Sequence, residues 1–251
     1  TSMRMAIDLV KNGKADAVIS AGNTGALLSI AYILLRTIEG ITRPAMTAYF
    51  PTKNGETAML DLGANIECDS KNLIDFALMG SAFSRIVLKS NNPSVGLLNV
   101  GVEAQKGNIV LQEAASYFTN NDNKINYFGF VEGDGIAEGV VDVIVTDGFS
   151  GNIALKTAEG TSKLVTTLLE KSFKSSIFSK LGYLLAKNGL RKMKNRVNPS
   201  KYNGAVLLGL NGIVVKSHGN TDSEGFSNAV KVGYEMVKGN FISDLKNQIS
   251  F

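Results

Sequence analysis

Residues 15–36 read ADAVISAGNTGALLSIAYILLR, and this stretch decides the fold class. Its β-branched and aliphatic opening, 15–20, predicts a strand, AGNTG predicts a tight turn, and 26–36 has the length of a helix. The same order recurs along the chain, and such alternation is typical of an α/β fold with a mostly parallel sheet and helices on both faces. Further strands are expected at 57–62, 94–100, 126–131 and 142–146, and further helices at 68–89, 109–118, 152–171 and 222–238.

The end of the chain carries a different signal. Two hydrophobic runs, 205–210 and 213–217, flank Asn211-Gly212, a dipeptide typical of a type I′ turn. They predict an antiparallel pair of strands added to the sheet. No fixed repeat and no linker rich in proline or serine divides the sequence, so we expect a single α/β domain over residues 1–251.

Composition restricts the class of protein. Of the 251 residues, 44% are hydrophobic and 19% are charged, which is ordinary for a soluble globular protein and argues against disorder. The opening residues lack the pattern of a signal peptide, no apolar run is long enough to span a membrane, and Cys68, the only cysteine, has no internal disulfide partner. We therefore expect a cytoplasmic protein. One cysteine and one histidine do not make a zinc site, so we expect no metal and no cofactor.

Glycine, asparagine and aspartate concentrate in the turns that follow the predicted strands. In open α/β sheets, ligands bind beyond the carboxyl ends of the strands, so these turns are candidate sites. In the first, Gly22-Asn23-Thr24-Gly25, two glycines would let backbone N–H groups approach an anion at a helix N-terminus, although capping by Asn23 or Thr24 explains the same residues. We predict substrate or phosphate binding for these four residues and, in later turns, for Asp61, Gly63, Asn65, Lys106, Asn108, Glu132, Asp147, Gly148, Gly151, Asn152, Asn220 and Asp222.

The last of these turns holds the only histidine. His218 lies two residues after Lys216, in a small-residue turn between a predicted strand and a predicted helix. A lone histidine is often structural, but a neighbouring lysine that suits phosphate as a point charge favours a functional one here. Ser150 is expected to cap a helix, and Cys68 is not expected to act as a nucleophile. We expect the turns at 21–25, 63–65, 148–152 and 217–222 to gather on one edge of the sheet.

A family resemblance rests on seven segments that follow one another across nearly the whole chain. They are VISAGNTGAL (18–27), RPAM (43–46), LDLGAN (60–65), GLLNVG with KGN (96–108), FVEGDGI (130–136), DVIVTDGFSGN (142–152) and AVLLGLNGIVVKSHGNTD (205–222). In these segments the chain resembles the acyl-[acyl carrier protein]:phosphate acyltransferase family, bacterial enzymes that make acyl-phosphate for phospholipid synthesis. Each segment alone is weakly specific, and their shared order makes the resemblance strong.

The resemblance implies a three-layer α/β/α sandwich similar to phosphotransacetylases and to isocitrate and isopropylmalate dehydrogenases. It also implies a homodimer, with acyl carrier protein as the partner that delivers the acyl thioester. Phosphate would attack the thioester carbonyl directly, so catalysis would depend on positioning and electrostatics. Lys216, His218 and Asn211, all in the last segment, are the candidate catalytic residues. The family has a further N-terminal segment of roughly eighty residues, with a Gly-rich turn, which we expect to be missing before Thr1.

Positive charge is concentrated in one segment. Residues 171–201 contain nine lysines or arginines and no acid, although the net charge is only +4. Apolar residues recur there at helical spacing on both sides of Asn188-Gly189, which predicts a protruding basic amphipathic helical hairpin. Docking of the acidic carrier protein, contact with an anionic membrane and packing in a dimer all remain open. The predicted partner or membrane surface consists of Lys187, Arg191, Lys192, Lys194 and Arg196.

Two other functions compete with acyl transfer from carrier protein. One is a coenzyme-A-dependent phosphotransacetylase, which would not need the basic hairpin. The other is a nucleic-acid-binding module that uses the basic segment. The aromatic residues there resemble an apolar face more than a stacking platform, so we expect no nucleic acid partner. These aromatics are Phe173, Phe178, Tyr183 and Tyr202.

Overall fold

The computed structural model describes residues 1–120, 125–196 and 198–249, apart from the side chain of Pro199. Val197, within the predicted hairpin, lies outside them. The strands are β1 (Ala17–Ser20), β2 (Ala45–Thr52), β3 (Gly55–Leu60), β4 (Ser94–Leu98), β5 (Asn126–Val131), β6 (Val143–Val145), β7 (Ala205–Leu208) and β8 (Ile213–Lys216). In the described residues they form one eight-stranded sheet in the order β1-β8-β7-β2-β3-β6-β4-β5.

The sheet has two parallel parts that run in opposite directions. β3, β6, β4 and β5 are parallel to one another, and so are β1 and β8. Three antiparallel pairings, β3 with β2, β2 with β7 and β7 with β8, join the two parts, so β1 and β8 run opposite to β3. The expectation that all the turns gather on one edge is therefore wrong. The turns after β1 and β8 leave one edge, and the turns after β3, β4, β5 and β6 leave the other.

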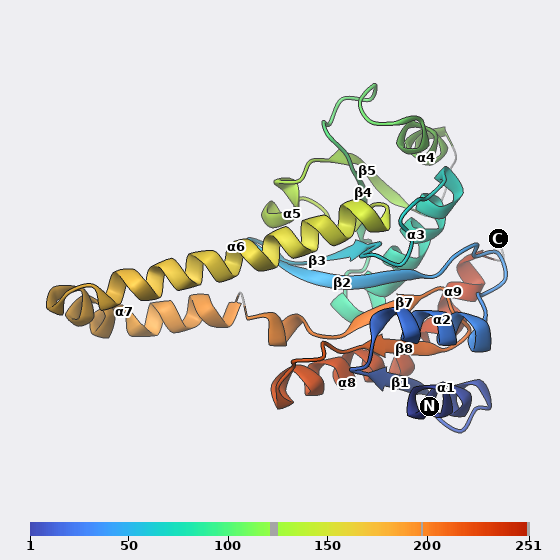
Figure 1. Ribbon diagram of the computed structural model, residues 1–251. Helices are drawn as coiled ribbons and strands as arrows, with labels where there is room; N and C mark the ends of the chain where they lie inside the picture. Colours follow the sequence, from blue (N-terminus) through green and yellow to red (C-terminus); the bar gives the residue numbers. More distant parts are fainter. Residues whose placement is uncertain (121–124, 197, 250–251) are drawn as a thin grey trace.

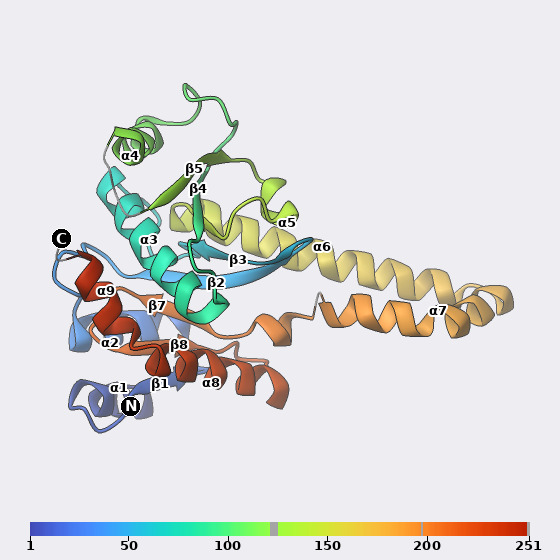
Figure 2. The same cartoon turned by 180° about the vertical axis from the view of Figure 1, so that it is seen from behind.

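Helices cover both faces of the sheet, which confirms the three-layer α/β/α sandwich (Figure 1). One face is covered by α3 (Ser70–Phe83), α4 (Ile109–Asn120), α8 (Ser223–Lys238) and α9 (Phe241–Ile249), of which α3, α8 and α9 lie in front in Figure 2. The other face carries α1 (Ser2–Lys11), α2 (Thr24–Leu35), α5 (Gly135–Glu138) and α6 (Gly148–Lys174). A π-helix, Ser84–Leu88, extends α3.

The two faces are filled differently. Under α3, α4, α8 and α9 one continuous hydrophobic cluster runs from Val206 and Val215 to Val95 and Leu97. The opposite face has two separate clusters. The first lies under α1 and α2 and includes Ile7, Leu27, Leu207 and Val214; the second lies under α5 and α6 and includes Phe50, Met59, Leu62 and Ile144. A gap between two clusters on one face is where a ligand could enter the sandwich.

Strand β2 is not expected from the sequence, although it makes two of the three antiparallel pairings. Its sequence, AMTAYFPT, contains Pro51, and proline inside a run argues against a central strand because it lacks the N–H group. Pro51 lies near the end of β2, opposite Glu56 of β3 and beyond the pairing with β7, which ends at Thr47. The reversed direction of β1 and β8 follows from this unexpected strand.

A helical hairpin is present, but the basic segment 171–201 supplies only its second helix and its turn, and the first helix is the long α6. α6 crosses the sheet and continues beyond it, and α7 (Ile177–Arg196) returns beside it (Figure 1). The turn lies at Ser175-Ser176, whereas Asn188-Gly189, where we expected an interruption, lies inside α7. A single exposed glycine in a helix costs only about 1 kcal/mol, so Asn188-Gly189 does not interrupt α7. Among the described helices, none is long and apolar enough to cross a membrane.

The first turn of α6 lies very close to the loop after β3, and its glycines allow this approach. The N–H of Gly148 donates to the carbonyl oxygen of Asn65 at 2.7 Å, and the side chain of Asp147 caps the helix by accepting from the N–H of Ser150 at 2.8 Å. A Cβ atom on Gly151 would clash with the carbonyl oxygen of Asp61. The motif DGFSGN therefore owes both of its glycines to packing.

We predict that Gly151→Ala destabilises the protein by about 1–3 kcal/mol, because the helix must move away from the loop after β3. The measurement is the free energy of unfolding by denaturant. Gly160→Ala is the matched control: Gly160 lies in the same helix with no atom within 4 Å of an added Cβ, so it should gain up to about 1 kcal/mol. Equal stability of Gly151→Ala and the native chain would contradict the packing argument.

Candidate active site

A cleft of about 760 Å³ lies on the face with two hydrophobic clusters, between those clusters, and α6 forms one wall. We call it the α6 cleft. Such a volume is typical of sites for small ligands. Its lining comes from Thr24 at the start of α2, from β2, from α6, from the base of the hairpin at 194–205, and from the turn after β8. α6 has 27 residues, about 40 Å, so it starts just after β6, crosses the sheet and extends beyond it toward α7.

The floor of the cleft is apolar and made partly of small side chains. Met46 and Ala48 of β2 face it, together with Ala205 of β7 and with Leu62. Ala205 is paired with Lys216 of β8 in the sheet, so both project from the same face. Met46 packs against both clusters, and the small alanine side chains beside it leave open space between them. An apolar chain fits such a floor better than a charged group does.

Lys216 is the charged group at the β8 end of the floor. Its side chain is half-buried, and burial lowers the pKa of its ammonium group. The ammonium donates a hydrogen bond to the carbonyl oxygen of Ser217. An anion bound beside it would act in the opposite direction by favouring the charged form. Lys216 is therefore placed to neutralise an anion at this end of the cleft.

His218 lies two residues after Lys216 in the turn after β8. Its side chain is exposed and lines the cleft. Its Nδ1 accepts a hydrogen bond from the backbone N–H of Asn220 at 3.3 Å. In the neutral ring one nitrogen accepts and the other donates, so this contact leaves the proton on Nε2. The imidazole can therefore offer an N–H donor to a ligand in the cleft.

The turns after β1 and β8 are neighbours, because these two strands are parallel and Ser20 is paired with Lys216. Thr24 and Asn220, one from each turn, both line the α6 cleft. Gly22 and Gly25 are exposed in the first turn, and the N–H of Gly22 donates to the hydroxyl of Ser20 at 3.2 Å. The N-termini of α2 and α8 both point to this region, which makes it favourable for an anion.

Of the predicted site residues, six line the α6 cleft: Thr24, Asn152, Lys194, Lys216, His218 and Asn220. Three others are helix caps. Asn23 accepts from the N–H of Ala26 at 3.0 Å, Asp222 accepts from that of Gly225 at 2.8 Å, and Asp147 caps α6 as described. In these three the structural interpretation accounts for the side chain.

Asp61, Gly63 and Asn65 build the loop after β3. The carboxylate of Asp61 is fully buried and accepts from the N–H groups of Met46, Ala64 and Asn65 and from the Asn65 side chain. Burial raises its pKa, and these hydrogen bonds act in the opposite direction. Gly63 has φ +115° and lies against the side chain of Asn152. Since its acceptor sites are occupied, Asp61 supports the site and does not bind substrate there.

Lys106, Asn108 and Glu132 follow β4 and β5 and do not line the α6 cleft. Asn108 accepts a hydrogen bond from the N–H of Leu111 at 3.0 Å in the first turn of α4, while Lys106 and Glu132 are exposed. Asn211 is also placed elsewhere. It lies at the opposite end of β8 from Lys216, and its side chain donates to the carbonyl oxygen of Thr37 at 2.8 Å. The geometry therefore removes Asn211 from the catalytic candidates.

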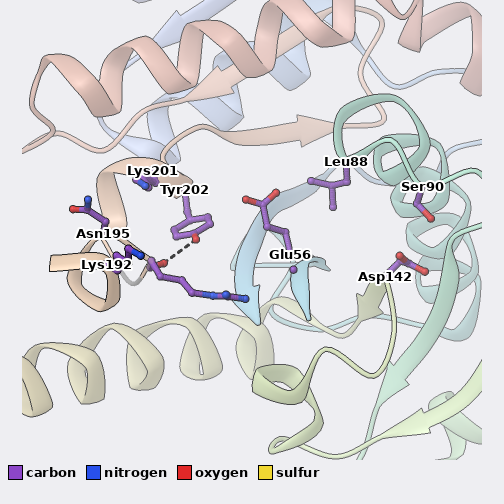
Figure 3. A pocket seen from close by; sticks show the side chains of 10 residues that line it. Glu56, Leu88, Ser90, Asp142, Lys192, Asn195, Lys201 and Tyr202 are labelled. Atoms are coloured by element: carbon purple, nitrogen blue, oxygen red, sulfur yellow. Dashed lines mark hydrogen bonds between the residues drawn. The ribbon is translucent and has the colours of Figure 1, made fainter. Parts of the chain in front are cut away.

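A second hollow, of about 700 Å³, lies beside the base of the hairpin (Figure 3). Lys192, Asn195, Lys201 and Tyr202 line one side, and Glu56, Leu88, Ser90 and Asp142 line the other. Lys192 and Arg196 are its only predicted site residues, and the Arg196 guanidinium donates to the carbonyl oxygens of Thr52 and Lys53 at 2.7 and 2.9 Å. Arg196 thus anchors the hairpin to the β2–β3 turn. The α6 cleft is the better candidate site, because six predicted site residues line it and only two line this hollow.

The comparisons with known proteins agree with the geometry. The model of the fatty acid synthesis protein family matches residues 1–244. The chain belongs to this family. The phosphate acyltransferase of Rhodospirillum centenum is 54% identical over 250 residues, covering all of this chain and 70% of the relative. That of Paramagnetospirillum magneticum is 54% identical over 237 residues, covering 94% of this chain and 68% of the relative. The protein is an acyltransferase of fatty acid and phospholipid synthesis, and the resemblance seen in the sequence is confirmed.

Solved structures share the fold at much lower identity. The EutD phosphotransacetylase from Staphylococcus aureus has a TM-score of 0.59 and 18% identity, covering 94% of this chain and 67% of that one. A phosphotransacetylase from Streptococcus pyogenes has a TM-score of 0.62 and 17% identity, covering 93% and 67%. The phosphotransacetylase-like fold is confirmed, and at this identity the likeness concerns the fold alone.

Cys68 is the only thiol of this acyltransferase and lies just after the loop of Asp61. Its Sγ lies 3.8 Å from the carbonyl oxygen of Asn65. Burial, followed by the charges of Asp61 and Asp147, raises the pKa of the thiol to about 12. Because the thiolate is the nucleophile, Cys68 is held in its inactive form at neutral pH.

We predict that iodoacetamide alkylates Cys68 on the order of 10²–10³ times more slowly in the folded protein than in denaturant at pH 8. The reason is the raised pKa, since an ordinary thiol has a pKa near 8.5 and each pH unit changes the thiolate fraction about tenfold. Mass spectrometry of the alkylated chain over time measures both rates. Equal rates would show that the thiol is not protected by its surroundings.

Proposed function

We propose that this acyltransferase moves a fatty acyl group from the thioester of acyl carrier protein to inorganic phosphate, in the α6 cleft. The observation that carries the proposal is the pair Lys216 and His218 on one turn at the end of an apolar floor. An acyl thioester has a long apolar part and an electrophilic carbonyl, and phosphate is an anion. The apolar floor suits the acyl chain of the thioester, and the turns after β1 and β8 suit phosphate.

The reaction needs no nucleophile from the protein. A phosphate oxygen of the hydrogen phosphate dianion attacks the thioester carbonyl, the C–O bond forms and the C–S bond breaks. The proton released by phosphate ends on the departing thiolate, so the products are acyl-phosphate and the free thiol. Lys216 would neutralise phosphate, and Nε2–H of His218 would donate to the oxyanion or to the leaving sulfur. Donors aimed at developing charge are the main means of catalysis in such a site.

The phosphate site proposed here consists of the turns Gly22–Gly25 and Ser217–Asp222. They are adjacent, they precede two helices of 12 and 16 residues, and Lys216 stands between them and the cleft floor. Asn152, from the start of α6, lines the opposite part of the cleft. Backbone N–H groups and one ammonium would therefore surround the anion, and the Asn152 amide would face the acyl donor.

A coenzyme-A-dependent phosphotransacetylase is the alternative function, and it shares the same chemistry at the carbonyl. The basic hairpin favours a carrier protein. A phosphate-dependent release assay separates the two when it is run with the same acyl group on acyl carrier protein and on coenzyme A. Faster turnover of the coenzyme A thioester would favour the alternative.

The hairpin is proposed to bind the acidic carrier protein, an anionic membrane surface, or both. Lys187, Arg191, Lys192 and Lys194 are exposed on α7, and the only carboxylate paired with them in the described residues is that of Glu170, 4.0 Å from Lys194. Exposed leucines accompany these cations and would enter a lipid surface or be covered by a second copy in the proposed homodimer. They are Leu164, Leu168, Leu181, Leu184 and Leu185.

We predict that His218→Ala and Lys216→Ala each lower the turnover number by about 10²–10³, because each removes a group that stabilises charge in the transition state. Cys68→Ala is the control, because it removes the only thiol that could act as a nucleophile. It should keep close to native turnover. Steady-state kinetics of acyl-phosphate formation measures all three, with circular dichroism to verify folding. Normal turnover in His218→Ala would make the histidine structural, and a trapped acyl-cysteine would refute direct attack by phosphate.

We also predict that reversing Arg191, Lys192 and Lys194 to Glu weakens binding to anionic vesicles by about 10²-fold, since each cation near such a surface contributes about 1 kcal/mol. Binding to carrier protein should weaken as well, and binding by the native protein should fall as salt rises. Reversal of Arg4, Lys11 and Lys14 makes the same charge change on the side of α1 and is the matched control. Unchanged binding of the hairpin variant to both partners at low salt would remove the hypothesis.

A further inference from the structure

The side chain of Asn203 contacts three residues of the turn that carries His218, although Asn203 lies on a different segment. Asn203 is 8% exposed and sits between the base of the hairpin and β7. Its amide nitrogen donates to the hydroxyl of Ser217 at 2.8 Å and to the carbonyl oxygen of Gly225 at 2.7 Å. The hydroxyl of Thr221 lies 3.4 Å from the same nitrogen. Its oxygen accepts the backbone N–H of His218 at 2.8 Å.

These contacts use both functions of a carboxamide at once. The two N–H donors and the oxygen acceptor meet partners on the turn and on the first turn of α8. Aspartate would keep the acceptor and lose the donors, and alanine would lose both. Ser217 is itself fully buried, and the Asn203 amide supplies a hydrogen-bond partner for its hydroxyl.

The segment that carries Asn203 is fixed on its other side too. At the base of the hairpin, the hydroxyl of Tyr202 donates to the carbonyl oxygen of Arg196 at 2.8 Å, drawn as the dashed line in Figure 3. The ring of Tyr202 meets that of Tyr49 edge to face, with centroids 5.9 Å apart. Through the Arg196 guanidinium, the same segment is bound to Thr52 and Lys53. Contacts of Arg196 and Tyr202 thus tie the neighbourhood of Asn203 to β2 and to the β2–β3 turn.

We propose that Asn203 is a positioning residue for the acyl transfer: it holds the β8–α8 turn so that Lys216 and His218 face the cleft. The proposal rests on the function proposed above for those two residues. Asn203 touches neither the reacting atoms nor the acyl chain in this role. It acts through the backbone of His218 and the side chain of Ser217, and it ties the active turn to the base of the hairpin.

The single histidine makes this proposal directly measurable. In a proton NMR spectrum, the ring of His218 gives the only histidine signals of the chain. Asn203→Ala and Asn203→Asp should shift these signals and lower the turnover number by about 10²-fold, the cost of a small misplacement of a catalytic group. The KM for the acyl thioester should change little. Asn203→Asp should not rescue activity, because it lacks the donors.

Asn228→Ala is the matched control. Asn228 donates one hydrogen bond, of 3.0 Å, to the carbonyl oxygen of Ser200 on the same segment, and it has no hydrogen bond to the turn. It should leave the histidine signals and the turnover number unchanged. Should both Asn203 variants fail to fold, Ser217→Ala tests the same contact from the other side, with the same two changes expected.

A double variant separates this proposal from the proposed function. If Asn203 acts through His218, Asn203→Ala combined with His218→Ala should be hardly slower than His218→Ala alone. Native turnover and unshifted histidine signals in folded Asn203→Ala, or in Ser217→Ala where it serves as the test, would overturn the positioning role and leave the proposed function intact. A different outcome is that Asn203→Ala shifts the histidine signals while Asn203→Ala and His218→Ala both keep native turnover. That outcome would overturn the proposed role of His218, and with it the positioning role of Asn203 in the reaction.

Discussion

The α6 cleft depends on one buried carboxylate, that of Asp61. It accepts hydrogen bonds from β2 through Met46 and from its own loop through Ala64 and Asn65. Asn65 in turn accepts the N–H of Gly148, the first residue of α6. A charged group without partners would be very costly in this interior, and the four donors make its burial tolerable. Because the floor of the cleft and the start of its wall meet at Asp61, the position of α6 over the sheet follows from these contacts.

Much of the fold could be predicted because local signals and tertiary structure agree. DVIVT forms β6, the hydrophobic runs on either side of Asn211-Gly212 form the antiparallel pair β7 and β8, and the alternation of strands and helices does form three layers. The predicted type I′ turn is wrong, because residues 209–212 join the two strands and Asn211 does not have the positive φ that such a turn requires. The wrong prediction of strand direction has one origin. Because β2 contains Pro51, its sequence did not predict a strand. Without β2, the opposite direction of β1 and β8 could not be deduced. Strand direction is a property of pairing between distant segments, and no local pattern encodes it.

The candidate site was predictable to a lesser degree. Residues such as Asn23, Asp147 and Asp222 have the same chemistry whether they cap a helix or bind an anion, and only the geometry shows that their side chains are occupied. Lys216 and His218 stood out because the only histidine of the sequence lies two residues after a lysine, in a turn between a predicted strand and a predicted helix. Asn203 gave no signal at all, since its partners lie 14 to 22 residues further along the chain.

The place of β1 in the sheet also has a consequence for how the protein is made. β1 lies at the edge and is hydrogen-bonded to β8, which the ribosome synthesises about two hundred residues later. Until β8 is made, β1 lacks this pairing, and the residues of α2 that pack against Leu207, Leu210 and Val214 in the finished fold lack those contacts. The half of the sheet with β3, β4, β5 and β6 is complete by Val145 and can assemble first. The two turns proposed to bind phosphate can therefore come together only after β8 has been synthesised.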